Sequence, residues 1–331
     1  MIKRNVLITG AGGFIGRNSC VFLKEKGYMV RAVVRNNKQD IFGAEECVNV
    51  ADINELTDWT KALQNIDWVI HLAGRAHVMN ECEKDPYSAY HRVNVLGTQR
   101  LAEQASQAGV SRFIFISSVK VLGENTANRS SVQHDVFTEE SIPDPKDHYA
   151  VSKLEAERRV AAICCNSSMQ EVILRLPLVY GPGVKANFLQ LIRLMDKNIP
   201  LPFGSISNRR SFIYVGNLCD IIELCLVHPG AARQLFLVSD KMDISTPRLI
   251  SMIAEGLKRK VHLFPCPMFL LRIIGLLTGK SAAIRRLTDS LCVQTEKLSA
   301  LTGWKPRFSV EEGIAQTVDF YKHTKNEKHK S

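Results

Sequence analysis

Thr9-Gly10-Ala11-Gly12-Gly13-Phe14-Ile15-Gly16 follows an apolar run at residues 6–9 and opens a stretch with helical spacing. Glycine in this segment permits backbone conformations that side chains forbid, and it lets a pyrophosphate approach the chain closely. The free N–H groups of the helix that follows can then bind phosphates. Because a second apolar run begins about 20 residues further on, the glycines lie within a βαβ unit. The segment predicts a dinucleotide-binding loop, with contacts from Gly10, Gly13, Phe14, Ile15 and Gly16.

Apolar, β-branched runs recur along the first 180 residues, at 6–9, 29–34, 68–73, 113–117 and 172–176. Helical patterns, such as 88–108 and 149–164, separate them. Runs without polar alternation are typical of strands buried on both faces. The alternation predicts an α/β fold, a Rossmann-like, doubly wound parallel sheet.

The spacing of elements changes after residue 180, where prolines punctuate shorter segments. We expect a dinucleotide-binding domain that carries the catalytic residues over 1–180. A smaller substrate-binding domain, with elements that can interleave with the first, is expected over 181–321. The polar, aperiodic residues 322–331 predict a basic disordered tail.

The end of the second expected strand indicates which dinucleotide binds. NAD sites usually place Asp or Glu there, whereas NADP sites favour Arg. The sequence reads Val33-Val34-Arg35-Asn36-Asn37, without an acid. Arg35 therefore favours NADP(H), with NAD(H) possible, and an exposed loop role is the alternative for this arginine. Asp52 and Ile53 lie just past a further strand expected between the runs at 29–34 and 68–73, and they are expected to border the adenine.

Tyr149 and Lys153 are spaced to share one face of a helix. A tyrosine near its usual pKa of about 10 is a poor base at neutral pH. A neighbouring lysine ammonium and a positive nicotinamide ring both favour the phenolate. Tyr149 can then exchange a proton with a substrate oxygen while hydride moves at the adjacent carbon. Ser118, directly after the strand expected at 113–117, is expected to hold the same oxygen.

Composition excludes several other classes. The formal net charge is +10. The sequence has no basic stripe interleaved with aromatic residues, so we do not expect it to bind nucleic acid. The nine cysteines form no CxxC pair, which is typical of reduced thiols in a cytoplasmic protein. His71 and His77 have no evident third ligand, so we expect no metal. The longest apolar stretch, 266–278, is too short to span a bilayer. It predicts a buried or surface amphipathic helix. A role at the membrane surface is the lesser alternative.

These motifs, together with Asn94 in V-N-V-L-G-T, R-L-P-L-V-Y-G-P at 175–182 and L-T-G-W-K-P at 301–306, carry a family resemblance. From residue 6 to about 320 the chain resembles an extended short-chain dehydrogenase/reductase of the nucleotide-sugar epimerase/dehydratase family. The resemblance implies a UDP-sugar substrate and a homodimer formed through helices 88–108 and 149–164. It implies that the cofactor is bound by Leu72, Ala73, Gly74, Asn94, Ser117, Pro177, Tyr149 and Lys153. It implies that the substrate is bound by Ser118, Asn187 and Arg210, with Arg209 as the alternative to its neighbour, and we expect His77 to line the sugar pocket.

Departures from the family pattern narrow the expected reaction. A 4,6-dehydratase carries Asp-Glu directly after the active-site hydroxyl residue, where this chain has Val119-Lys120. A fucose-synthase-like enzyme needs a cysteine at the position of Val119. The favoured interpretation is reduction of a UDP-4-keto-6-deoxy-N-acetylhexosamine, of the N-acetylquinovosamine type. Such a reaction belongs to surface-polysaccharide (O-antigen, lipopolysaccharide) biosynthesis. UDP-hexose 4-epimerisation is the alternative, and a non-catalytic dinucleotide sensor is a further one.

Overall fold

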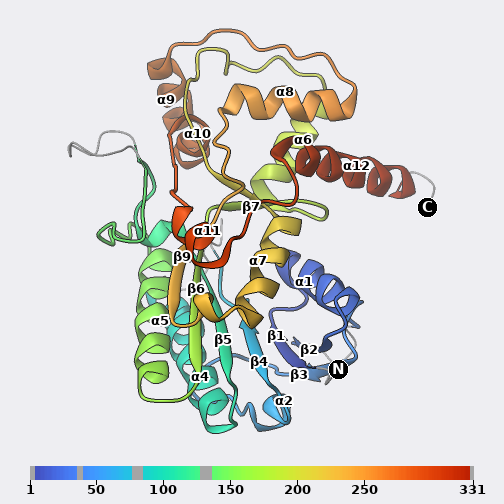
Figure 1. The fold of residues 1–331 in the computed structure, drawn as a ribbon. Helices are drawn as coiled ribbons and strands as arrows, with labels where there is room; N and C mark the ends of the chain where they lie inside the picture. The colour runs from blue at the N-terminus through green and yellow to red at the C-terminus, as the bar shows by residue number, and fades with distance from the viewer. Residues whose placement is uncertain (1–3, 36–39, 77–84, 127–135, 329–331) are drawn as a thin grey trace.

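The computed structural model describes residues 4–35, 40–76, 85–126 and 136–328. Its centre is a seven-stranded sheet in the order β3-β2-β1-β4-β5-β6-β9, and every pairing is parallel. The predicted doubly wound parallel fold is confirmed, and all five expected strands are present (Figure 1). The strands are β1 (Asn5–Thr9), β2 (Met29–Val34), β3 (Glu46–Asn49), β4 (Trp68–His71), β5 (Arg112–Ser118), β6 (Gln170–Leu176) and β9 (Gln234–Leu237).

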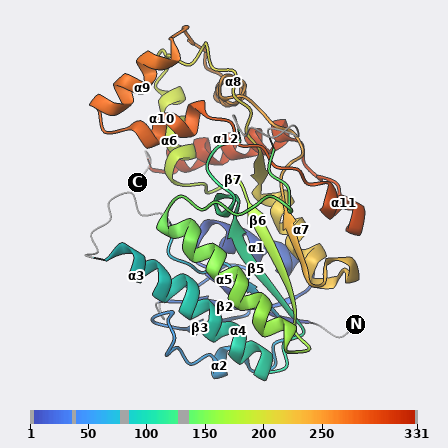
Figure 2. The same ribbon diagram turned by 90° about the vertical axis from the view of Figure 1, so that its left-hand side faces the viewer.

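Helices cover both faces of this sheet, because successive strand residues point to opposite sides. Val6 and Ile8 of β1 lie in the core beneath α1 (Phe14–Glu25) and α7 (Val215–Val227). Leu7 lies in the opposite core, beneath α4 (Gly97–Gln107) and α5 (His148–Cys165). Figure 2 shows α4 and α5 side by side on one face of the sheet. Burial on both faces explains the continuous apolar runs of the strands.

A second, mainly helical lobe lies beyond the carboxyl ends of the strands (Figure 1). Its core packs α6 (Ala186–Asp196), α8 (Thr246–Leu257) and α12 (Val310–Lys328) around a two-stranded parallel sheet of β7 (Leu178–Tyr180) and β8 (Phe212–Tyr214). The remaining elements are α2 (Thr60–Leu63), α9 (Met268–Leu277), α10 (Ser281–Thr288) and α11 (Glu296–Thr302).

The two parts of the chain interleave. α7 and β9 both follow residue 181, yet α7 covers the sheet and β9 pairs with β6. The division into domains at residue 180 stays a prediction.

The predicted disordered tail is wrong for residues 322–328. α12 continues to Lys328, and its last turns are tied to the helical lobe. Lys325 Nζ lies 2.5 Å from Asp196 Oδ2, and Lys322 Nζ donates to the Gly256 carbonyl at 3.1 Å. These partners are distant in sequence, so the polar composition of the segment did not reveal them.

The helix expected over 88–108 is divided into three pieces. α3 (Pro86–Tyr90) leads into a π-helical segment, His91–Leu96, which α4 continues. π-Segments are frequent at functional sites because they shift the side chains that follow. Here the segment carries the buried Asn94.

The apolar stretch 266–278 contains α9, which buries only Leu271 and Gly275. Of the two forms expected for this stretch, the structure therefore shows the surface helix. Across the part of the chain that the structure describes, no helix is both long and apolar enough to cross a membrane.

Candidate active site

The glycine loop packs against the end of β4. Gly10 has φ +68°, and a Cβ there would lie 2.7 Å from the Ala73 amide nitrogen. A Cβ on Gly16 would overlap the Gly10 carbonyl and lie 2.7 Å from the Ala11 Cα. Gly13 donates its N–H to the Gly10 carbonyl at 2.9 Å and precedes the first turn of α1, where no side chain within the described residues caps the helix. The loop therefore fits a dinucleotide pyrophosphate, which needs close backbone approach and free N–H groups.

Two residues that follow the loop have packing roles. Ile15 packs against the core of the sheet, and Phe14 packs against the core of the helical lobe. The Phe14 ring lies 3.9 Å from where a Cβ on Gly183 would stand. The first turn of α1 thus joins the loop to the second lobe.

The expected adenosine-binding residues lie at the ends of β2 and β3. Arg35 is exposed. Asp52 forms an ion pair with Arg92 and accepts the Ile53 N–H at 3.0 Å. Ile53 is buried against Gly97, where a Cβ would come within 2.5 Å of the isoleucine side chain. Ile53 therefore supports the sheet, whereas Arg35 is accessible to a ligand.

The segment after β4, Leu72, Ala73 and Gly74, lies between the loop and α5. The Ala73 N–H donates to Thr9 Oγ1 at 3.1 Å. Asn94 accepts the Arg75 N–H at 2.7 Å and donates to Ser152 Oγ at 2.9 Å. Asn94, expected to bind the cofactor, thus fixes the segment after β4 against α5.

His71 is a buried structural residue. One ring nitrogen lies 2.7 Å from Thr9 Oγ1 and the other 2.9 Å from Thr98 Oγ1. Burial, aided by the nearby charge of Lys153, lowers the pKa of His71 to about 3, so the ring is neutral. The described residues contain no group of His, Cys, Asp and Glu side chains that could hold a metal ion.

Ser118, Tyr149 and Lys153 come together where β5 meets α5. Burial raises the pKa of Tyr149 to about 12, and a hydrogen bond with Ser118 partly opposes that rise. Lys153 donates its Nζ to the Ile116 carbonyl at 2.7 Å, and burial lowers its pKa to about 8. The phenolate that the sequence analysis expected is therefore not favoured by the protein alone. A bound dinucleotide with a positive nicotinamide ring would supply the missing stabilisation.

A buried ion pair lies behind this trio. Glu157 accepts from Arg175 Nε at 3.0 Å and from Arg175 Nη2 at 2.7 Å. Ser117 donates its hydroxyl to the same carboxylate, so this serine, expected to bind the cofactor, faces the ion pair. Sequence reasoning missed Glu157, although it follows Lys153 by four residues on the same helix face.

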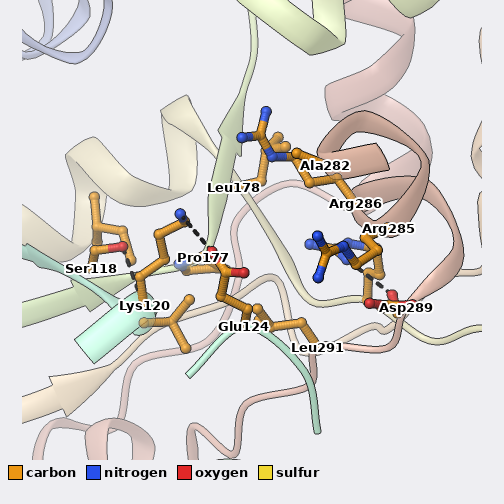
Figure 3. Close-up of a pocket in the computed structure, with 13 residues that line it drawn as sticks. Ser118, Lys120, Glu124, Pro177, Leu178, Ala282, Arg285, Arg286, Asp289 and Leu291 are labelled. Atoms are coloured by element: carbon orange, nitrogen blue, oxygen red, sulfur yellow. Dashed lines mark hydrogen bonds and ion pairs between the residues drawn. The ribbon is translucent and has the colours of Figure 1, made fainter. Parts of the chain in front are cut away.

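A cavity of about 260 Å³ opens beside Ser118, as Figure 3 shows. Pro177 and Arg210 line it, and Arg210 donates from Nη1 to the Asp289 carbonyl at 2.9 Å. Arg209 forms an exposed ion pair with Asp243 instead, at 3.0 Å, and does not line this cavity. Of the two adjacent arginines, the structure therefore brings Arg210 to the pocket.

The opposite wall of the cavity was not predicted. Arg285 and Arg286 of α10 stand there, across from Ser118 and Lys120 (Figure 3). Lys120 Nζ lies 2.6 Å from Asp147 Oδ2 and 3.0 Å from Glu124 Oε1. The cavity is thus rich in arginine and suits an anionic ligand.

The structure brings neither of two further predicted substrate contacts to this cavity within the residues that it describes. Asn187 is half-buried in the first turn of α6 and does not line this cavity. His77 lies outside the described residues.

A glycine loop after β1 and a Ser118–Tyr149–Lys153 set after β5 meet at the carboxyl edge of one parallel sheet. Together they define an NAD(P)-dependent enzyme of the short-chain dehydrogenase/reductase type. A model of the NAD dependent epimerase/dehydratase family matches residues 6–238. The chain belongs to that family.

Relatives of the chain include 4-epimerases. The chain is 43% identical over 329 residues to a Vibrio cholerae protein described as UDP-glucose 4-epimerase, with 98% of each chain covered. It is 26% identical to an Escherichia coli O157:H7 protein described as N-acetyl-alpha-D-glucosaminyl-diphospho-ditrans,octacis-undecaprenol 4-epimerase, with 98% and 97% covered. The solved structure of MoeE5 in complex with UDP-glucuronic acid and NAD matches with a TM-score of 0.76 at 26% identity, covering 97% of this chain and 99% of that one.

Proposed function

We propose that this protein is an NAD-dependent UDP-hexose 4-epimerase, acting on UDP-glucose, UDP-N-acetylglucosamine or both. The observation that carries the proposal is the 43% identity, over nearly the whole of both chains, to a protein described as UDP-glucose 4-epimerase. The reductase interpretation favoured in the sequence analysis has less support than its alternative. The bound NAD in the MoeE5 structure favours NAD over the NADP that Arg35 suggested.

In this proposal Tyr149 moves the proton at the sugar O4. Its phenolate takes the hydroxyl proton as the C4 alcohol becomes a ketone, and the phenol returns that proton to the new alcohol. The glycine loop, Gly10 to Gly16, would hold NAD, and the nicotinamide would supply the hydride acceptor and donor for C4. Ser118 holds the same oxygen, and Lys153 favours the phenolate by its positive charge. Because proton and hydride both return, the reaction consumes no reductant.

The cavity beside Ser118 supports a diphosphate-linked substrate. Arg210, Arg285 and Arg286 line it, and a guanidinium binds phosphate oxygens in a two-pronged manner. Since the keto sugar must turn over between the two hydride transfers, we infer that these arginines hold the diphosphate while the sugar rotates. A homodimer through α4 and α5 remains a prediction.

Reduction of a 4-keto sugar is the second candidate, and Arg35 favours it. This arginine is exposed at the end of β2, where an acid would select NAD. A reductase must exchange its dinucleotide in every cycle, and NADPH is the usual reductive pool.

The experiment that separates the two candidates begins with the purified protein. Its bound dinucleotide is released by denaturation and identified by mass spectrometry. The protein is then incubated with UDP-glucose or UDP-N-acetylglucosamine without added cofactor. An epimerase yields the C4 epimer with no net change in reduced nicotinamide, and Tyr149→Phe yields it far more slowly. Stoichiometric NADPH oxidation with a UDP-4-keto-6-deoxy-N-acetylhexosamine, and no epimer from the first two sugars, would overturn the proposal.

A further inference from the structure

α9 exposes an apolar face that the fold does not use. Of its ten residues, only Leu271 and Gly275 are buried. Six large apolar side chains are between 41% and 80% exposed: Phe269, Leu270, Ile273, Ile274, Leu276 and Leu277. Single exposed apolar residues are ordinary, but a contiguous group of this kind marks a surface that meets another apolar phase.

The segment of sequence that contains α9 carries charges of one sign only. Between residues 256 and 288 the sequence contains no Asp or Glu and seven Lys or Arg residues. Arg259 is paired with Asp196 at 3.4 Å. Arg272 lies on α9 itself and Lys280 in the turn that follows, and both are exposed. The apolar face thus carries a basic border, which complements an anionic surface.

The position of α9 suits contact with a large flat partner. Figures 1 and 2 both show the helix at the outer margin of the helical lobe, away from the main sheet. α10 follows it and contributes Arg285 and Arg286 to the cavity beside Ser118 (Figure 3). One helical hairpin therefore combines an outward apolar face with a wall of the candidate active site.

We propose that α9 docks this enzyme onto the surface of an anionic lipid bilayer. Ten residues span about 15 Å as a helix, half the thickness of a bilayer core, so α9 lies in the plane of the interface. Its leucine, isoleucine and phenylalanine side chains enter the boundary between headgroups and acyl chains. Arg272 and Lys280 bind lipid phosphates at that depth.

A second copy of the chain is a poorer occupant of this face. A two-fold contact would bring the same basic border against itself, and like charges would repel. A phosphate-bearing bilayer neutralises these charges instead. The charge pattern therefore selects the membrane.

The test is flotation of the intact protein with vesicles of phosphatidylethanolamine and phosphatidylglycerol, compared with vesicles of phosphatidylcholine alone. We expect binding to the anionic vesicles and weaker binding in high salt. Leu276→Asp with Leu277→Asp should weaken binding about a hundredfold, because two leucines lose their apolar contact with lipid.

The matched control is Leu56→Asp with Ile142→Asp. These side chains are 83% and 82% exposed and lie outside the 256–288 segment, so this variant should bind vesicles like the parent. Circular dichroism and melting temperature verify the fold of each variant. Absence of binding by the parent, or equal binding by the Leu276/Leu277 variant, would overturn the proposal.

Sedimentation velocity tests the other occupant. If the parent binds no vesicles but forms an oligomer that the Leu276/Leu277 variant loses, the face belongs to a second copy and the proposal is wrong. Vesicle binding is read without turnover, so its outcome is independent of which reaction the enzyme catalyses.

Discussion

Replacing Glu157 with glutamine removes the charge of the buried carboxylate but keeps its shape. Glu157 and Arg175 have side chains only 4% and 5% exposed, and two hydrogen bonds join them. Loss of one partner of such a pair leaves the other charge buried and uncompensated, which costs about 3–5 kcal/mol. Glutamine can still accept a hydrogen bond, so we expect a loss of about 3 kcal/mol in the free energy of unfolding.

The same substitution should change the pH dependence of turnover. Burial lowers the pKa of Lys153 to about 8, and the Glu157 carboxylate opposes that shift. Without the carboxylate, the pKa of Lys153 falls further. If catalysis needs the Lys153 ammonium, the alkaline limb of kcat/KM moves toward neutral pH.

Glu155→Gln is the matched control, on the same helix and two residues away. Glu155 forms an exposed ion pair with Arg159 at 3.4 Å, worth less than about 1 kcal/mol. Urea denaturation followed by circular dichroism gives both stabilities, and the pH profile of kcat/KM gives the second readout. If Glu157→Gln costs no more than Glu155→Gln and leaves the alkaline limb in place, the role assigned to the ion pair is refuted.

Three further predictions concern single residues. Tyr149→Phe should lower kcat about 10²–10⁴-fold with dinucleotide affinity retained, measured by turnover and fluorescence titration; near-normal turnover would exclude proton transfer by Tyr149. Gly10→Ala should cost more stability in urea than Gly27→Ala, since both glycines have positive φ but only Gly10 lacks room for a Cβ; equal losses would contradict the close packing against Ala73. The pKa of His71 is about 3 in the folded protein and about 6.5 in the unfolded chain. As the pH falls from about 7 to about 5, the His71 ring therefore gains a proton only in the unfolded chain. The free energy of unfolding should then drop about 2 kcal/mol from about pH 7 to about pH 5. If it falls as steeply with pH in His71→Gln as in the parent, this reasoning is contradicted.

Buried strands gave the clearest signal in the sequence. Five strands were predicted because burial on both faces requires continuous apolar runs. β9 was not assigned, since Gln234-Leu-Phe-Leu237 is four residues long and has no β-branched residue. The π-helical segment His91–Leu96, which divides the expected helix 88–108, could not be predicted from the sequence either. A π-segment has the same apolar composition as the α-helices beside it.

The proposed catalytic residues Tyr149 and Lys153 could be picked out because their spacing places them on one helix face. Ser118 could be picked out because it ends an apolar strand run. The pocket wall was less predictable. Arg209 and Arg210 offer the same chemistry, and the choice between them depends on where Asp243 and Asp289 lie in the fold. Arg285 was missed because it lines the same cavity as Ser118 from a helix more than a hundred residues away in sequence.

The pairing of β9 with β6 has a consequence for synthesis of the chain. Every residue of the glycine loop and of the proposed catalytic trio precedes residue 154, but the last strand of the sheet is not made until residues 234–237 have been synthesised. Until then a nascent chain presents the apolar β6 as an open edge, which can pair with other chains. We therefore expect fragments that end near residue 180 to aggregate, and the earliest point of productive folding on the ribosome to come after β9 has emerged.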